Sequence, residues 1–278
     1  MAIRIITDST SDIPLENCPS LGIDIVPLSV IIDGTKYTDG VDLKKEQFYE
    51  LLEKSTTLPT TSQVNPDGFL GLFQQYIDAG DDVLVILISS KLSGTYQSAV
   101  IAKDMVDSDR IRVVDSKSAT FGLALLVYEA IRLRDSGSSA EDIHHHLLAL
   151  RDSVQFIAGV DTLKYLKMGG RLSSSAAIIG GMLQIKPLVS IIGGEVKSVG
   201  KVRGQKAVLA HLADTLKTHP PDTRYPIVFG HTLAPQLLDE LKGLVQDVAL
   251  GVQYVCEIGC VIATHSGPGC IGFAYVPK

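Results

Sequence analysis

A turn rich in hydroxyl groups is the stretch of this sequence whose residue types most clearly suggest chemistry. Residues 89–95 read Ser-Ser-Lys-Leu-Ser-Gly-Thr and follow the apolar run 83–88. Where a buried strand gives way to a turn and a helix, free N–H groups at the helix N-terminus attract anions. The turn lacks the sequence of a phosphate-binding loop, and hydroxyl and amide groups can satisfy a carboxylate without a fixed cation. The alternative is that Ser93 is a helix N-cap and nothing more.

Three further polar segments could belong to the same site, and each also has a purely structural interpretation. The segment 58–63, Leu-Pro-Thr-Thr-Ser-Gln, adds hydroxyls but is typical of a solvated surface turn, which the sequence slightly favours. His265 enters a Gly-Pro-Gly loop at 267–269 that joins two predicted strands, where it could be a catalyst or a structural hydrogen-bonding group. Gly-Gly-Arg at 169–171 could shape the site, or it could end one helix and precede another.

A serine hydrolase is the enzymatic alternative. Ser93 and His265 could form a triad with Asp8 or Asp115. Against this, Ser93 follows Lys-Leu and is not in the Gly-x-Ser-x-Gly elbow that exposes a nucleophile. A third possibility is a protein that binds sugar or nucleotide phosphates, and it rests only on the polar residues at the ends of predicted strands.

Histidine and cysteine spacing does not predict a metal site. Successive residues of a helix point about 100° apart, so the three histidines at 144–146 cannot converge on one ion. Ile143 and Leu147 define the buried face there, so we expect the histidines at the surface. The four cysteines form no Cys-x-x-Cys pair, and Cys256 and Cys260 lie in a predicted strand region. Buried free thiols are therefore favoured over a zinc site.

The elements that must position these residues alternate between strand and helix over the first 150 residues. Apolar runs predict strands at 3–6, 23–32, 36–38, 83–88 and 111–114. Amphipathic spacing predicts helices at 44–54 with Asp42 as the N-cap, from Pro66, from Ser93, at 118–134 and at 140–150. This alternation predicts a largely parallel sheet with helices on both faces. The polar strand ends at Asp8, Ser89 and Asp115 then meet at the edge where such sheets bind ligands.

The pattern changes after residue 152. The Gly- and Ser-rich segment 169–175 leads into an apolar helical stretch, and Gly193–Gly194 predicts a hairpin between strands 188–192 and 195–199. Further strands are expected at 154–160, 227–230, 252–256, 260–263 and 271–276, and helices around 209–216 and 237–244. We therefore expect an α/β fold with two domains, residues 1–152 and 153–278, the second smaller and built on a mixed sheet.

Composition excludes some partners and compartments. The formal net charge of −6 argues against a nucleic-acid partner, because neutralising phosphates requires a basic face. The start of the chain, Met-Ala-Ile-Arg-Ile-Ile, does not read as a signal peptide, so we expect a cytoplasmic protein. The apolar stretch 176–194 contains Gln184, Lys186 and Pro187, so membrane insertion is not expected.

Five motifs occur in order along nearly the whole chain and together resemble the DegV family. They are Asp-Ser-Thr-Ser-Asp at 8–12, Pro-Thr-Thr-Ser-Gln at 59–63, Ser-Gly-Thr-Tyr at 93–96, Gly-Gly-Arg at 169–171 and His-Ser-Gly-Pro-Gly at 265–269. The resemblance implies a fold of two α/β domains with a long-chain fatty acid buried between them, no cofactor and no catalytic activity. The family includes the carrier subunit of bacterial fatty-acid kinase, which presents the acyl carboxylate to a separate ATP-using kinase for phosphorylation.

The resemblance also assigns roles to individual residues. Carried over position by position, it implies that the carboxylate is bound by Thr61, Ser62, Ser93 and the amide of Gly94. Arg171 and His265 would belong to the adjoining polar network, and Arg203 would dock the partner kinase. Two places depart from the family pattern. Residues 64–66 read Val-Asn-Pro where Pro often follows Ser-Gln directly, and Met168 stands where Lys is more usual.

Overall fold

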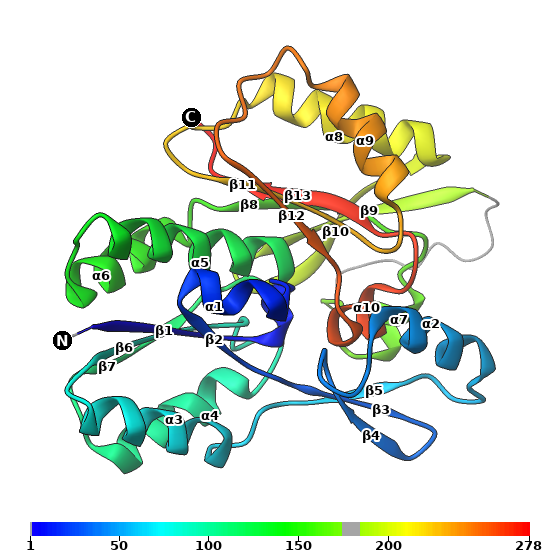
Figure 1. The fold of residues 1–278 in the computed structure, drawn as a ribbon. Coiled ribbons are helices and arrows are strands. Elements are labelled where there is room, and N and C mark those ends of the chain that lie inside the picture. Colours follow the sequence, from blue (N-terminus) through cyan, green and yellow to red (C-terminus); the bar gives the residue numbers. More distant parts are fainter. Residues whose placement is uncertain (1, 174–183) are drawn as a thin grey trace.

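The computed structural model describes residues 2–173 and 184–278, and Figure 1 shows it as a ribbon. A parallel four-stranded sheet in the order β2–β1–β6–β7 organises the first half of the chain. Its strands are β1 (Ile3–Asp8), β2 (Ile23–Val26), β6 (Asp82–Leu87) and β7 (Ile111–Asp115). The register pairs Thr7 with Ile86 and Leu87 with Asp115, so the polar strand ends meet at one edge, as expected.

Helices cover both faces of this first sheet. The helices α3 (Asp67–Asp78) and α4 (Thr95–Val106) lie below it in Figure 1, and α5 (Thr120–Asp135) and α6 (Ala140–Leu150) lie above it. The helical spacing of apolar residues decides which side of each helix is buried. In α3, for example, Phe69, Phe73 and Tyr76 are buried at positions i, i+4 and i+7. The strands of this sheet are covered on both faces, which explains why β6 is a continuous apolar run.

A mixed sheet organises the second half of the chain. Its order is β10–β9–β8–β13–β11–β12, in which only the β11–β12 pair is parallel among the described strands. Its strands are β8 (Gln155–Gly159), β9 (Ile185–Ile192), β10 (Glu195–Arg203), β11 (Ile227–His231), β12 (Gln253–Glu257) and β13 (Ile271–Tyr275). The helices α8 (Gln205–Thr218) and α9 (Pro235–Leu244) cover its upper face in Figure 1. The expected fold class is confirmed.

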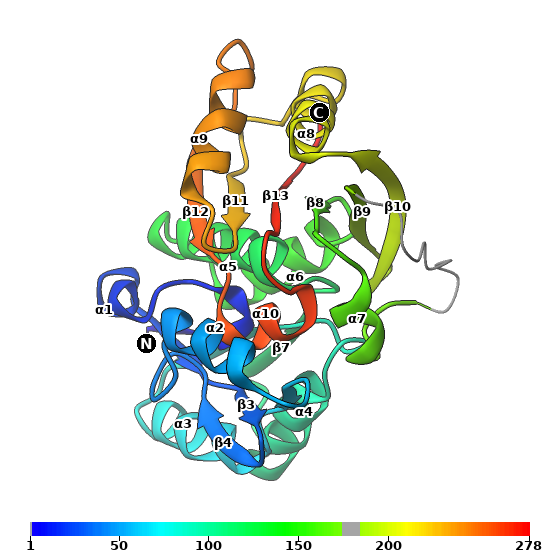
Figure 2. The same cartoon turned by 90° about the vertical axis from the view of Figure 1, so that its right-hand side faces the viewer.

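The helix α5 lies between the two sheets. It contacts β1 and β6 of the parallel sheet and β8, β11 and β13 of the mixed sheet. Every residue from Thr120 to Ile131 is buried, so α5 is apolar nearly all round and not amphipathic. Figures 1 and 2 show the resulting layers, with helices and sheets alternating along the height of the molecule.

A small antiparallel sheet corrects two sequence-based expectations. The single strand expected over 23–32 is wrong, because Pro27 cannot donate to a sheet ladder and divides it into β2 and β3 (Ser29–Ile32). The strand β3 pairs with β4 (Thr35–Thr38) through the predicted hairpin, and on its other side with β5 (Thr60–Ser62). The favoured surface turn at 58–63 is therefore also wrong, since residues 60–62 form an edge strand.

Shorter helices complete the described fold and correct two further expectations. They are η1 (Ser9–Ser11), η2 (Leu15–Asn17), α1 (Cys18–Leu21), α2 (Lys45–Lys54), α7 (Lys164–Met168) and α10 (Cys260–Ser266). The strand expected at 260–263 is wrong, because a short apolar run is equally compatible with a buried helix. Asp42 does not cap α2. Its carboxylate accepts a hydrogen bond from the backbone N–H of Thr38 instead.

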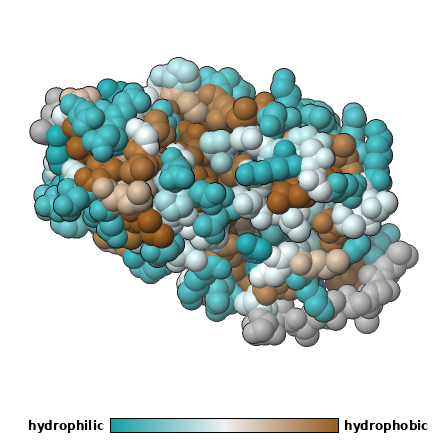
Figure 3. Space-filling model, turned by 90° about the horizontal axis from the view of Figure 1, so that it is seen from below, coloured by the Kyte–Doolittle hydropathy of each residue, from teal (hydrophilic) through white to brown (hydrophobic). Residues whose placement is uncertain are grey.

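The molecular surface carries no single dominant apolar face in the view from below. Figure 3 shows brown apolar patches there, separated by hydrophilic side chains. Among residues 2–173 and 184–278, no helix has the length and apolar character needed to cross a membrane. The apolar helical stretch expected after Ser175 falls on residues 174–183, outside the described residues.

Truncating the middle of α5 tests how much stability its burial between two sheets provides. Leu126 is fully buried, so we expect Leu126→Ala to lower the free energy of unfolding by about 2–5 kcal/mol. Chemical denaturation followed by circular dichroism measures this. Leu133→Ala, at a half-buried position near the end of the same helix, is the matched control and should cost clearly less. Equal losses in the two variants would contradict the central role of this helix.

Candidate functional site

A cavity of about 290 Å³ is lined by residues from both halves of the chain. Its lining contains a group that we call the polar cluster: Thr61, Ser62, Gln63, Ser93, Gly94, Arg171 and His265. Most of the remaining lining is apolar and includes Leu28, Ile88, Phe121, Phe156, Val189, Val196, Val261 and Ile262. An apolar cavity with a few polar groups is the usual composition of a small-molecule site.

Thr61 and His265 connect the two halves of the chain inside the polar cluster. Thr61 lies on β5, where it pairs in register with Val30 of β3, and His265 lies in the last turn of α10. The Thr61 Oγ1 and His265 Nε2 atoms are 2.9 Å apart. The imidazole tautomer determines which atom donates. If Nε2–H donates, the Thr61 hydroxyl keeps its proton for a ligand, and if Thr61 donates, only its lone pairs remain.

Close packing keeps His265 neutral. The helices α7 and α10 lie side by side below the mixed sheet (Figure 2), and a Cβ atom on Gly169 would collide with His265 Nδ1. Burial, followed by the positive charge of Arg171, lowers the pKa of His265 to about 4. The Nδ1 atom has no hydrogen-bond partner in the described part of the chain. At neutral pH the imidazole therefore serves the cluster as an uncharged hydrogen-bonding group.

Arg171 lines the cavity, but its guanidinium is already bound to backbone carbonyls. Its Nε atom donates to the Leu92 carbonyl at 3.1 Å, and its Nη1 atom donates to the Gly169 carbonyl at 2.7 Å. These bonds connect the α7 end to the turn that precedes α4. Arg171 therefore brings positive charge to the cluster while part of its donor capacity is used to hold two loops together.

Gly94 is required for close packing and not for backbone strain. Its φ of −73° is open to any residue, but an added Cβ would collide with the Gln63 side chain. Gln63 in turn donates from its Nε2 atom to Ser98 Oγ at 3.0 Å. The contact brings the segment around β5 against the start of α4. It explains how two hydroxyl-rich segments distant in sequence line the same cavity.

The hydroxyl-rich turn divides between structural and cavity-lining roles. Ser93 lines the cavity and its Oγ lies 2.9 Å from Thr95 Oγ1, whereas the N-cap position of α4 belongs to Gly94 and not to Ser93. Ser89 donates to the Gly194 carbonyl at 2.8 Å, and Ser90 donates to Asp115 at 2.6 Å. The hydroxyls of Ser89 and Ser90 therefore hold neighbouring segments, whereas Ser93 lines the cavity.

The geometry does not support the serine hydrolase alternative. The Asp8 carboxylate accepts hydrogen bonds from the Thr10 N–H and hydroxyl groups and from the Ile88 N–H. Asp115 is bound to Ser90 and to the Lys117 N–H. Neither carboxylate is a hydrogen-bond partner of His265 in the described residues. The histidine contacts Thr61, so Ser93, His265 and an aspartate do not form a triad.

The sequence does not distinguish the aromatic wall of the cavity from ordinary core. Phe121 and Phe156 stack with ring centroids 4.7 Å apart and nearly parallel planes. They come from the first turn of α5 and from β8. Each belongs to an apolar run that predicts only burial, so the signal in the sequence is the same as for any core phenylalanine.

The remaining candidate residues, apart from Cys270, lie away from the cavity lining. Arg203 is exposed at the end of β10. His145 is exposed, and His146 Nε2 lies 3.0 Å from the buried carboxylate of Glu129. Cys18 is a half-buried free thiol, and the buried free thiols are those of Cys256, Cys260 and Cys270. In the described ranges, no group of three or more His, Cys, Asp or Glu residues could hold a metal ion.

Comparison with known proteins gives consistent matches over the full length. A family model described as an uncharacterised protein of the DegV family matches residues 2–278. A DegV domain-containing protein from Caldanaerobacter subterraneus subsp. tengcongensis is 40% identical over 278 residues, covering 99% of each chain. Two solved structures are also similar. One, from Thermus thermophilus, is described as a fatty-acid-binding DegV family protein and has 32% identity and a TM-score of 0.90, covering 99% of this chain and 100% of that chain. The other, a stearic-acid-binding protein from Eubacterium ventriosum, has 30% identity and a TM-score of 0.88, covering 100% and 99%.

The lowered pKa of His265 makes stability depend on pH in a defined window. We expect its imidazole to titrate near pH 4, whereas an exposed histidine titrates near 6.5. Between these values the imidazole of His265 binds more protons in the unfolded chain than in the folded chain, so its contribution to stability falls as the pH falls. The raised pKa values of the buried Asp8 and Asp12 act in the opposite direction, so the contribution of His265 is measured as a difference between variant and wild type. NMR titration of the His265 ring and denaturation at pH 7 and pH 5 measure both effects. The stability of His265→Gln relative to the wild type should therefore increase from pH 7 to pH 5. A ring that titrates at 6.5 or above would contradict the expectation.

Proposed function

This chain belongs to the DegV family, and on that premise we propose that it binds one long-chain fatty acid. The acyl tail would occupy the cavity, and the carboxylate would lie at the polar cluster. The observation that carries the proposal is a mostly apolar cavity with a polar cluster drawn from both halves of the chain, in which Thr61 contacts His265. The Thermus thermophilus and Eubacterium ventriosum proteins bind fatty acid according to their descriptions, which supports the same class of ligand here.

The tail provides most of the binding free energy. Each buried methylene contributes roughly 0.8 kcal/mol, so a tail of about fifteen methylenes contributes about 12 kcal/mol before the costs of association. The walls that would bury it come from strands and helices of both halves of the chain, such as Phe121 of α5 and Val189 of β9. We propose that the cavity lies between two domains, residues 1–152 and 153–278.

The carboxylate then needs hydrogen-bond donors and a defined position, and does not need tight electrostatic binding. Thr61, Ser62, Ser93 and the Gly94 amide are neutral groups on the cavity lining. A bidentate arginine would occupy both carboxylate oxygens. The guanidinium of Arg171 is bound to two carbonyls, which supports a role beside the carboxylate as part of the network with His265.

A carrier without catalytic activity of its own fits this site better than an enzyme. The hydrolase triad is not formed, and neutral donors would leave carboxylate oxygens free to react with another protein. We propose that the chain presents the carboxylate to a separate ATP-using fatty-acid kinase in the cytoplasm and needs no cofactor. Arg203, exposed at the end of β10 and outside the cavity, is the proposed docking residue.

Lipid identification tests the proposed ligand directly. Native mass spectrometry of the purified protein should show one bound fatty acid, and delipidated protein should take up one equivalent of added stearic acid. Sugar and nucleotide phosphates should leave the melting temperature unchanged, whereas stearic acid should raise it. An empty protein that refuses stearic acid, or one stabilised only by phosphates, would contradict the proposal.

Ser93→Ala tests the carboxylate site. Losing one hydrogen bond to a charged group should weaken fatty-acid binding by about 1.5–3 kcal/mol while leaving the fold intact. Isothermal titration with stearic acid measures the change. Ser90→Ala is the matched control, since its hydroxyl lies in the same turn but is bound to Asp115. Unchanged affinity in the Ser93 variant would remove this residue from the site.

A further inference from the structure

Two buried aspartates hold the N-terminus of α10, the helix that carries His265 near its other end. Asp12 Oδ1 accepts a hydrogen bond from the Gly259 N–H at 3.0 Å, and Asp39 Oδ1 accepts one from the Cys260 N–H at 3.1 Å. Gly259 is the N-cap of α10 and Cys260 is its first residue. The aspartates are 6% and 3% exposed. They therefore satisfy N–H groups that the helix itself cannot satisfy.

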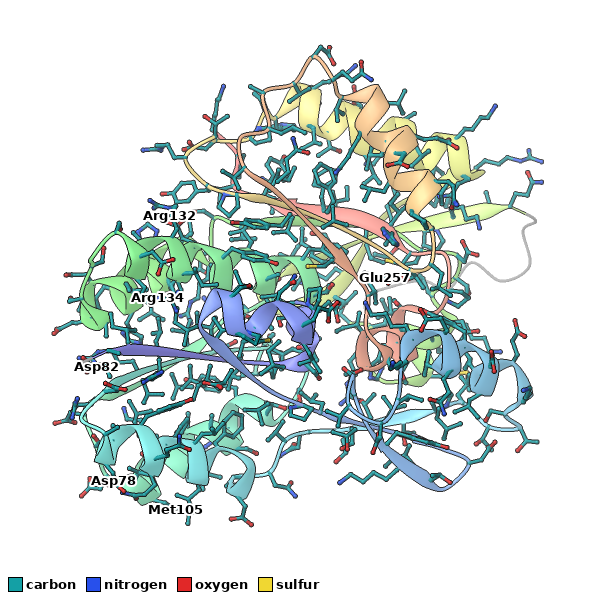
Figure 4. The ribbon with its side chains drawn as sticks, viewed as in Figure 1. Asp78, Asp82, Met105, Arg132, Arg134 and Glu257 are labelled. Carbon is teal, nitrogen blue, oxygen red and sulfur yellow. The ribbon has the colours of Figure 1, made fainter. Side chains whose placement is uncertain are left out.

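Both aspartates come from the opposite half of the chain. Asp12 ends the 8–12 motif in a left-handed backbone conformation with φ 55°, and Asp39 directly follows β4. A third contact joins the same two segments, because Lys45 Nζ donates to the Glu257 carbonyl at 2.8 Å. Figure 4 labels Glu257 where β12 runs down to α10. Side chains from residues 12–45 thus hold the end of β12 and the beginning of α10 at three points.

Gly259 makes this close approach possible. An added Cβ would lie 2.9 Å from Asp12 Oδ1, which is closer than an ordinary contact. The backbone at Gly259 is extended, with φ −77°, so another residue could adopt it. The space beside Asp12, and not the backbone angle, explains the glycine.

The arrangement carries an energetic cost. Burial raises the pKa of Asp12 to about 7, with the neighbouring charge of Asp39 adding to the shift, and burial also raises the pKa of Asp39. The Thr120 hydroxyl, the Gly259 N–H and the charge of Lys45 lower the pKa of Asp12 and offset part of this shift. Two carboxylates placed together in the interior are costly, so general stability is a poor explanation for them.

We propose that Asp12 and Asp39 are positioning residues that set the placement of α10 and thereby bring His265 against Thr61. This inference rests on the proposed function, because it assigns the two aspartates to the fatty-acid site without contact to the ligand. Gly259 and His265 are separated by about 9 Å along the helix axis. Over so short a helix, a shift or rotation at the N-terminus moves the imidazole by a similar amount.

The experiment measures stearic-acid binding to delipidated protein by isothermal titration, in a double-mutant design. Asp39→Ala and Asp12→Ala should each weaken binding by about three- to tenfold when His265 is present, and by less than twofold in a His265→Ala background. Asp39→Asn, which keeps the acceptor oxygen, should restore binding to within twofold of the wild type. Equal losses with and without His265, or no loss in either variant, would overturn the proposal.

A second readout separates this inference from the proposed function. The 15N resonance of His265 Nε2 in ligand-free protein should shift in Asp39→Ala and return in Asp39→Asn, whether or not the wild type binds stearic acid. An unmoved resonance would overturn the positioning role alone. Failure of the wild type to bind stearic acid would count against the proposed function alone.

Two further variants test whether misfolding or a general loss of stability could explain a shift of the resonance. Gly259→Ala displaces the carboxylates without removing either, so it should shift the same resonance even where the alanine variants fail to fold. Ser139→Ala removes the side-chain cap of α6, which accepts from the Asp142 N–H at 3.1 Å, far from this helix in the fold. It should lower stability without moving the His265 resonance. A shift in Ser139→Ala as large as in Gly259→Ala would overturn the proposal.

Discussion

The burial of α5 between the two sheets is the packing constraint on which the rest of the structure depends. A helix in contact with a sheet on each side fixes the distance between those sheets, and its twelve consecutive buried residues leave no face for solvent. The cavity lies at the N-terminal end of this helix, where Ala119, Thr120 and Phe121 form part of the lining. The cavity therefore lies where α5 begins, and the packing of α5 fixes the distance between the two sheets beside it.

The polar cluster completes the lining of this cavity mainly with neutral hydrogen-bonding groups. His265 is held neutral by burial, and Arg171 is held by two carbonyls, so hydroxyl and amide groups are left to face the cavity. Neutral donors suit a ligand whose affinity comes from its apolar part, because they orient a carboxylate without competing for it as strongly as a bidentate cation would. Gly94 and Gly169 allow the close packing of the cluster, because a side chain at either position would collide with Gln63 or His265, respectively.

Much of this could be predicted from the sequence, and the failures have physical causes. Alternating apolar runs and amphipathic helices predicted the parallel sheet correctly because local burial decides those patterns. The apolar run 23–32 predicts one strand, but Pro27 divides it between two sheets. The segment 260–263 reads locally as a strand, whereas it begins α10, whose first N–H groups are bound by carboxylates more than 220 residues away in the sequence, and no local pattern records such contacts. The segment 58–63 reads locally as a surface turn for the same reason. It forms a strand by pairing with β3, and Thr61 reaches the site through its contact with His265.

The same long-range contacts explain why the motifs at the site are ones that predict little when taken singly. A hydroxyl, a glycine pair or a single histidine predicts little from the local sequence, because each contacts a residue from another part of the chain. Thr61 meets His265, Gly169 makes room for His265, and Arg171 reaches Leu92. On the proposed function, a bound acyl tail would touch the walls from both halves and so add to the packing that holds these partners together. Ligand binding and the order of the polar cluster would then be thermodynamically linked, since a ligand that binds only the assembled walls stabilises them by a free energy that grows with the logarithm of its concentration relative to its Kd.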